Sequence, residues 1–307
     1  MKNSKLKFLF FLLILFINTK TLFANTHFYT VEESQRKGVG IKGLNQKSTK
    51  HFRELYMADS KIKWLSDVLV DSIPYRPYIK SQLKKKKMPL CLQYLPIVES
   101  NYKVTAVSSS GATGLWQFME NSMSPYMKKS WWYDERYDPW KETDAALHKL
   151  LDNYKTFGDW AFALAAYNMG AGAIKRIQKA HPGKDFWYLA ENGYIRKETA
   201  EYVPKLLAIA DIIDNAEYWG LIQIAACDKM IYGLAPETFD YINITGKISL
   251  EKISSVTEIN FETLKKLNPA LIKNFTPPEM TWKLRVPKGS TKEAAEKLRQ
   301  FKKQDTK

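Results

Sequence analysis

The chain has 307 residues, of which 45% are apolar, and this indicates a globular protein with a proper core, built as one large or two modest domains. It carries 47 basic and 32 acidic residues, so its formal net charge is +15. Two cysteines and four histidines without metal-ligand spacing argue against a metal site, and we expect no metal and no cofactor.

The first residues have the pattern of a secretory signal peptide. Lys2, Lys5 and Lys7 precede the apolar run 8–17, and the small residue Ala24 precedes a polar segment. The run falls short of the roughly 20 apolar residues that span a bilayer. We therefore expect cleavage after residue 24 and an exported protein of the periplasm or cell envelope, soluble or peripherally attached to a membrane.

The expected mature chain is still strongly basic, because loss of four lysines in residues 1–24 lowers the charge from +15 to +11. Export argues against a nucleic-acid partner, so an anionic cell-wall polymer or lipid surface fits better, and a lysine-rich proteome is the alternative. Cys91 and Cys227 could form a disulfide, but a buried free thiol is an equal alternative because Cys91 lies in an apolar run. We expect a monomer.

Residues 25–85 form a lead-in that is first polar and then helical. An apolar helical spacing begins at His51 and continues to Pro74. The run Lys84–Lys87 is interpreted as a solvated helix end, with contact to an anionic glycan as the alternative.

Glu99 is the best catalytic candidate. It follows the apolar run 90–98, so apolar neighbours should disfavour its ionised form and let it act as an acid near neutral pH. The small residues 108–114 suit a turn that approaches a ligand closely, and Trp116 and Gln117 could offer a sugar an aromatic face and an amide. The alternative is that Glu99 merely caps a helix or is solvated.

Helices and loops are expected from about residue 50 to 215. We expect residues 118–126 to continue as a helix up to Pro125, residues 131–140 to be irregular and rich in aromatic side chains, and new helices to start at Asp144 and Trp160. A further amphipathic stripe is formed by Tyr202, Leu206, Ile209 and Ile213.

The composition changes near Pro236, which indicates a separate small module. Residues 241–244 alternate as a short strand, two short helices follow around 253 and 264–267, and residues 284–287 resemble a closing strand. The tail from Thr291 is a charged helix or a disordered end.

Four separated motifs resemble the soluble lytic transglycosylase catalytic domain (glycoside hydrolase family 23). They are Leu95–Ser100, then Ser108 with Gly111-Ala112 and Gly114–Gln117, then Ala166-Tyr167-Asn168 with Gly170, and Glu198-Thr199 with Tyr202–Lys205. Residues 131–134 and 185–187 add to a likeness over about 86–220. It implies a mainly α, lysozyme-like domain with a groove for a peptidoglycan glycan strand.

The resemblance also implies roles for seven residues. Glu99 matches the catalytic acid, and Tyr202 the aromatic residue that faces it. The remaining matches are to substrate-binding positions: Ser108, Gln117, Met119, Tyr167 and Asn168. For Tyr167 and Tyr202, ordinary core packing is the alternative, because both fit apolar helix stripes.

The C-terminal module resembles a LysM repeat less closely. Its turn at 245–249 departs from the usual Gly-Asp-Ser/Thr, and residues 270–282 are long for the pattern, so a packing or spacer role is as plausible as sugar binding. The expected division is a signal peptide (1–24), a lead-in (25–85), a catalytic domain (86–225), a small α+β LysM-like module (236–290) and a charged tail (291–307).

The resemblance implies cleavage of the β-1,4 bond between N-acetylmuramic acid and N-acetylglucosamine, with 1,6-anhydromuramoyl ends as products of cell-wall remodelling or turnover. Two other interpretations stay open. One is a goose-type lysozyme, which hydrolyses the bond with water; an additional carboxylate across the groove would support this interpretation. The other is a non-catalytic peptidoglycan-binding protein, which would not need a carboxyl in an apolar setting.

Overall fold

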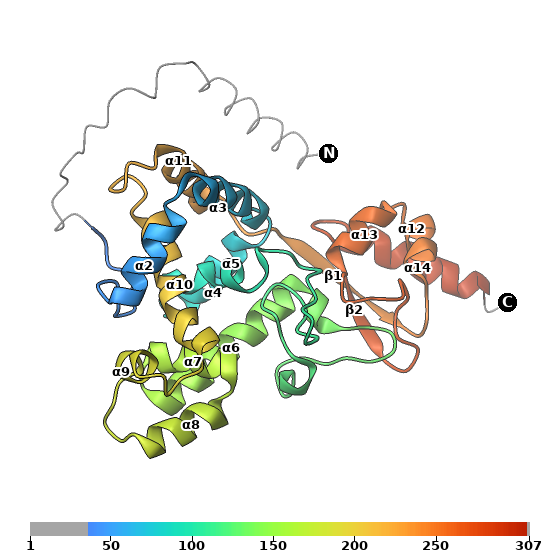
Figure 1. The fold of residues 1–307 in the computed structure, drawn as a ribbon. Helices are drawn as coiled ribbons and strands as arrows, with labels where there is room; N and C mark the ends of the chain where they lie inside the picture. The colour runs from blue at the N-terminus through green and yellow to red at the C-terminus, as the bar shows by residue number, and fades with distance from the viewer. Residues whose placement is uncertain (1–35, 306–307) are drawn as a thin grey trace. The chain divides into compact units, whose positions relative to one another are not determined.

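The computed structural model describes residues 36–305 (Figure 1). The predicted signal peptide and most of the polar lead-in lie outside these residues. The helices of the larger, N-terminal part are α2 (Lys47–Tyr56), α3 (Asp59–Ser72), α4 (Arg76–Lys85), α5 (Leu95–Ser100), α6 (Pro139–Phe157), α7 (Trp160–Met169), α8 (Ala171–Ala180), α9 (Phe186–Glu191), α10 (Lys197–Asp214) and α11 (Ile222–Gly233), with 3-10 turns η2 (Leu90–Tyr94), η3 (Glu120–Ser122) and η4 (Glu135–Tyr137).

Helix α10 lies at the centre of this part and contacts α2, α5, α7 and α11. All four members of the predicted stripe from Tyr202 to Ile213 are buried, so that interpretation is confirmed. Residues 161–167 of α7 are buried on every side, because this helix packs between α6, α8 and α10. The mainly α character expected from the sequence is confirmed.

Helix α6 begins at Pro139, five residues before the predicted start at Asp144, and that prediction is wrong. Asp138 is the N-cap: its carboxylate accepts hydrogen bonds from the backbone N–H of Trp140 (3.2 Å) and Lys141 (3.0 Å). Proline suits the first helical position, where no N–H is needed. The capping signal lay inside the segment that the aromatic residues had marked as irregular.

The predicted helix over residues 118–126 is also wrong. Only Glu120–Ser122 form a 3-10 turn. Thr113 and Phe118 exchange two backbone hydrogen bonds of 3.0 Å, and Gln117 between them has a φ of 51°. This short bridge turns the chain back on itself before a helix can start.

A buried polar network fixes η2 and the start of α5. Arg76 of α4 donates to Gln93 Oε1 (2.8 Å) and to the Tyr94 hydroxyl (2.9 Å), and it forms an ion pair with Asp228 of α11. The Tyr94 hydroxyl in turn donates to Asp214 at the end of α10 (2.5 Å). Since these contacts join the helices α4, α10 and α11 to η2, they also fix the segment that leads directly into Glu99.

The two cysteines are both free and buried, so of the two alternatives the buried thiol is the one observed. The run of lysines from 84 to 87 coincides with the end of α4, as expected for a solvated helix end.

The C-terminal module is a two-stranded antiparallel sheet with three helices (Figure 1). Strand β1 (Phe239–Thr245) pairs with β2 (Thr281–Pro287) so that Ile242 lies opposite Leu284. Helices α12 (Leu250–Thr257), α13 (Phe261–Leu267) and α14 (Thr291–Asp305) pack beside it. The charged tail is therefore a helix, and its Ala294 and Leu298 are buried in the module's core.

The module is joined to the helical part by buried contacts. Arg285 of β2 forms an ion pair with Asp138, the N-cap of α6. Tyr133 belongs to the module's apolar core, where its ring lies 4.9 Å from that of Trp282. The backbone N–H of Asp134 donates to the carbonyl of Ala270 (2.9 Å). The aromatic segment 131–134 thus forms part of the module's packing surface.

Candidate active site

Glu99 is half-buried near the end of α5, and its carboxylate accepts a hydrogen bond from the hydroxyl of Tyr202 on α10. Burial raises the pKa of Glu99 from 4.5 to about 7. The hydrogen bond from Tyr202 and the positive charge of Lys149 act in the opposite direction, and the negative charge of Glu198 raises the pKa further. The carboxyl can therefore hold its proton near neutral pH, which a general acid requires.

The turn that follows Glu99 is closed by Ser108. Its hydroxyl accepts a hydrogen bond from the backbone N–H of Ala112 (3.0 Å), and its own N–H donates to the Ala112 carbonyl (2.8 Å). The side chain of Ser108 is thus engaged in holding the turn, and its predicted role in binding the substrate stays a prediction.

Gly114 is the position in this turn where only glycine fits. Its φ is +91°, and a Cβ there would lie 2.1 Å from the carbonyl oxygen of Arg136 and 2.5 Å from the carboxylate oxygens of Glu142. The close approach of α6 to this turn therefore depends on the missing side chain.

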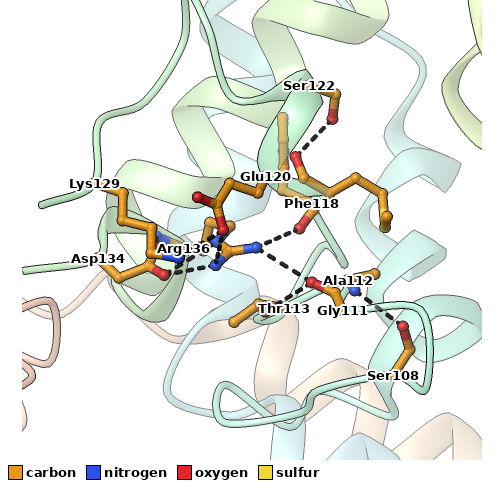
Figure 2. Close-up of polar contacts among 11 residues, drawn as sticks. Ser108, Gly111, Ala112, Thr113, Phe118, Glu120, Ser122, Lys129, Asp134 and Arg136 are labelled. Atoms are coloured by element: carbon orange, nitrogen blue, oxygen red, sulfur yellow. Dashed lines mark hydrogen bonds and ion pairs between the residues drawn. The ribbon is translucent and has the colours of Figure 1, made fainter.

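Arg136 holds the turn from the other side. Figure 2 shows its guanidinium between the carboxylates of Asp134 and Glu120 and the carbonyl oxygens of Gly111 and Phe118. Arg136 Nη2 lies 2.7 Å from Asp134 Oδ2, and Nη1 donates to the two carbonyls at 3.2 and 3.3 Å. Because Arg136 is buried, these hydrogen bonds fix both ends of the strand-like segment 111–118.

Gln117 and Met119 lie on either side of Phe118. The Gln117 side-chain amide donates to the carbonyls of Gly114 (2.9 Å) and Ala106 (3.3 Å), so its N–H groups stabilise the loop. Met119 is 36% exposed, which leaves its side chain accessible to a ligand. The predicted roles of both residues in binding the substrate stay predictions.

Tyr167 connects α7 to the same loop. Its hydroxyl donates to the carbonyl of Trp116 (2.9 Å), and its ring meets that of Phe118 edge-on at 5.9 Å. Tyr167 is buried, as core packing would require, and burial raises its pKa; the negative charge of Glu99 raises it further. Tyr167 is therefore part of the core and lies near the carboxyl of Glu99.

Asn168 is held by residues just before and within α10. Its side-chain oxygen accepts hydrogen bonds from Thr199 (2.5 Å) and Arg196 (3.3 Å), and its amide donates to Glu198 (3.1 Å). Arg196 also lines a cavity of about 370 Å³ next to α9 and α10, whose lining does not include Glu99. Hydrogen bonds of Asn168 with Thr199 and Glu198 thus bring together the two motifs at residues 167–168 and 198–202 that the resemblance rests on.

Comparison with known families identifies both parts of the chain. Residues 76–190 match the Transglycosylase SLT domain, and residues 238–303 match the LysM-like domain of lytic transglycosylase MltD. The chain carries an SLT lytic transglycosylase domain. The resemblance inferred from the motifs is confirmed, and so is the LysM-like character of the module.

Two of the similar proteins carry a name that agrees with this assignment. The chain is 32% identical over 211 residues to membrane-bound lytic murein transglycosylase D of Escherichia coli K12, and equally to the protein of that name from strain O6:H1. The match covers 67% of this chain and 44% of the relatives' length. A putative tributyltin chloride resistance protein of Alteromonas sp. strain M-1 is 36% identical over 131 residues, which is 40% of this chain and 62% of that protein.

Two residues of helix α6 lie near Glu99 but were not predicted as site residues from the sequence. Glu142 is fully buried, and its carboxylate accepts hydrogen bonds from the backbone N–H of Leu115 (2.6 Å) and Trp116 (3.0 Å). Burial raises its pKa. Lys149, seven residues further along, lies on the same face of the helix and senses the charge of Glu99. A helix correctly started at Pro139 would have placed both charged side chains on its buried face.

The described residues contain no helix that is both long and apolar enough to cross a membrane.

Proposed function

We propose that this chain is a peptidoglycan lytic transglycosylase, which cleaves the β-1,4 bond between N-acetylmuramic acid and N-acetylglucosamine and leaves 1,6-anhydromuramoyl ends. The observation that carries the proposal is the carboxyl of Glu99, whose pKa burial raises to about 7 within an SLT domain. The E. coli relative, of which the chain spans less than half, is named a lytic murein transglycosylase.

In the proposed reaction, protonated Glu99 gives its proton to the glycosidic oxygen, and the bond from that oxygen to C1 of the muramic residue breaks. The carboxylate so formed then takes the proton of the muramic 6-hydroxyl, whose oxygen closes onto C1. The Tyr202 hydroxyl holds the carboxyl in place through both steps. Intramolecular attack has effective molarities of roughly 10⁵ M and above, so neither a positioned water nor a second carboxylate is needed.

The hydrolytic alternative needs a carboxylate that delivers water. Two carboxylic acids come into question, because Glu142 senses the charge of Glu99 and Glu198 raises the pKa of Glu99. Glu142 is fully buried and accepts two backbone N–H groups, so it cannot bind an incoming water. Glu198 accepts a hydrogen bond from the Asn168 amide and is largely exposed. The complete burial of Glu142 favours the transglycosylase over the lysozyme-like hydrolase.

The proposed setting is the cell envelope, with the glycan strands of peptidoglycan as partner and cell-wall remodelling or turnover as the process. We also propose that the protein is exported, and that it is a monomer that is soluble or peripherally attached to a membrane. The basic charge of the chain supports this setting, because an anionic wall polymer attracts a cationic protein.

The test is the substitution Glu99→Gln. The glutamine carbonyl can still accept the Tyr202 hydroxyl, so the fold should persist while the acid proton is lost. General acid catalysis contributes about 10² to 10⁴ in rate, and with no second carboxylate we expect a loss at the top of that range. Glu217→Gln, the same change at an exposed residue, is the control. Release of muropeptides from purified sacculi at a near-normal rate by the Glu99 variant would refute the assignment.

A further inference from the structure

Lys149 occupies an unusual place on the inner face of α6. Its ammonium nitrogen lies 5.0 Å from the ring centroid of Phe118 and 4.9 Å from that of Tyr167. These two rings meet edge-on, and the Tyr167 hydroxyl is hydrogen-bonded to the loop that leads to Gln117. The cation is therefore held by aromatic faces inside the candidate active site.

Ring faces hold a cation without cancelling its charge, whereas a carboxylate partner would neutralise it. Among residues 36–305, Lys149 makes neither a hydrogen bond nor an ion pair. Its side chain is half-buried, and burial lowers its pKa while the charge of Glu99 raises it. The positive charge is thus available to whatever negative charge forms next to it.

Glu99 is the group on which this charge acts, because Lys149 lowers its pKa. The other titratable groups that face Glu99 come from three helices, namely Tyr202 and Glu198 from α10, Glu142 from α6 and Tyr167 from α7. None of these is basic. Lys149 is therefore the cationic counterpart in a site that is otherwise made of acids and phenols.

We propose that Lys149 is a positioning residue of the transglycosylase reaction, whose ammonium group stabilises the carboxylate that Glu99 becomes when it gives up its proton. The inference rests on the proposed function. Glu99 passes from neutral to negative as its proton moves to the glycosidic oxygen, and it returns to neutral when it takes the proton of the 6-hydroxyl. The charge of Lys149 does not change during either step. Lys149 therefore stabilises the stage at which Glu99 is a negative carboxylate, without exchanging a proton itself.

The test compares Lys149→Met, whose side chain is unbranched, one heavy atom shorter and uncharged, with Lys149→Arg, which keeps the charge. For Lys149→Met we expect a rate on sacculi about tenfold lower at pH 6, because the carboxylate loses its counter-charge. The ratio of the rate at pH 8 to that at pH 6 should rise about three- to tenfold, since Glu99 then keeps its proton to higher pH. Lys149→Arg should resemble the parent protein in both respects.

Lys155→Met is the matched control, since Lys155 lies on the solvent side of the same helix and pairs with the exposed Asp152. A Lys149→Met variant with an unchanged pH profile would overturn the proposal, whether or not its rate or thermal stability fell. The same holds if the Arg variant shifts its profile as far as the Met variant.

A second measurement separates this inference from the proposed function. The carboxyl carbon of Glu99 can be titrated by NMR in ¹³C-glutamate-labelled protein, with Glu99→Gln used to assign the signal. A midpoint that moves to higher pH in Lys149→Met supports the electrostatic link, and an unmoved midpoint refutes it. If the parent protein forms no anhydro product, the proposed function fails, while this titration still reports on Lys149.

Discussion

The ion pair between Arg285 and Asp138 links two parts of the chain that lie 147 residues apart, and the substitution Arg285→Met tests its contribution. Both side chains are buried, with 6% and 2% of their surface exposed. Breaking a buried pair costs about 3 to 5 kcal/mol, because one charge is left without its partner. Asp138 keeps the two N–H donors of α6, so we expect the lower part of that range, about 3 kcal/mol.

Loss of the guanidinium also removes its stacking on Trp140 (4.9 Å) and Phe239 (4.8 Å). Each such contact is worth about 0.5 to 1 kcal/mol, so the total destabilisation is about 4 to 5 kcal/mol. At about 2 to 4 °C per kcal/mol, thermal unfolding followed by circular dichroism should show a Tm lower by about 8 to 20 °C.

The matched control is Arg299→Met, which breaks an exposed pair with Glu296 in the same module, where 62% and 47% of the two side chains are exposed. Exposed pairs contribute about 0 to 1 kcal/mol, so its Tm should change by less than about 4 °C. If Arg285→Met loses no more stability than Arg299→Met, the buried pair does not hold the module to the SLT domain.

Three further outcomes are expected. Because burial raises the pKa of Glu99 to about 7, the cleavage rate should fall as the pH rises above about 7, and a flat rate profile from pH 6 to 9 would contradict this. The free energy of folding that Glu99 contributes below pH 4.5 should be lost between pH 4.5 and about 7. Tyr202→Phe removes a donor that lowers the pKa of Glu99, so the fall in rate should move to higher pH, whereas Tyr188→Phe at an exposed ring should leave it in place. We propose that the LysM-like module is a separate domain, so a chain ending at Gly233 should fold, with a lower Tm because contacts to β2 are lost; a circular dichroism spectrum without helix would contradict the boundary.

Local patterns predicted the parts of the structure that depend on local forces. The apolar run before Glu99 correctly predicted that burial would raise the pKa of its carboxyl. The stripe beginning at Tyr202 correctly predicted the buried face of α10, because a 3.6-residue spacing of apolar side chains needs no knowledge of the partner helix.

The failures occurred where a capping or long-range contact decided the structure. The N-cap at Asp138 was overlooked because aromatic residues surround it, and this moved the start of α6 and hid Glu142 and Lys149. The helix expected after Gln117 does not form, because the backbone of Phe118 is hydrogen-bonded to that of Thr113.

The contact between the two parts of the chain could not be foreseen from spacing alone. The pairing of Arg285 with Asp138 and the packing of Tyr133 in the module's core join segments that are distant in sequence. The motifs in the two segments were recognised separately, but neither motif predicts that the two segments contact each other.

The central claim is that the muramic 6-hydroxyl, and not water, is the nucleophile. Digestion of purified sacculi in ¹⁸O-water followed by mass spectrometry tests it directly, with Glu99→Gln as the inactive control. We predict 1,6-anhydromuramoyl ends without ¹⁸O, since no water enters the product. Reducing ends about 18 Da heavier than the anhydro product before labelling, and carrying ¹⁸O, would contradict the account and establish a hydrolase on the same substrate.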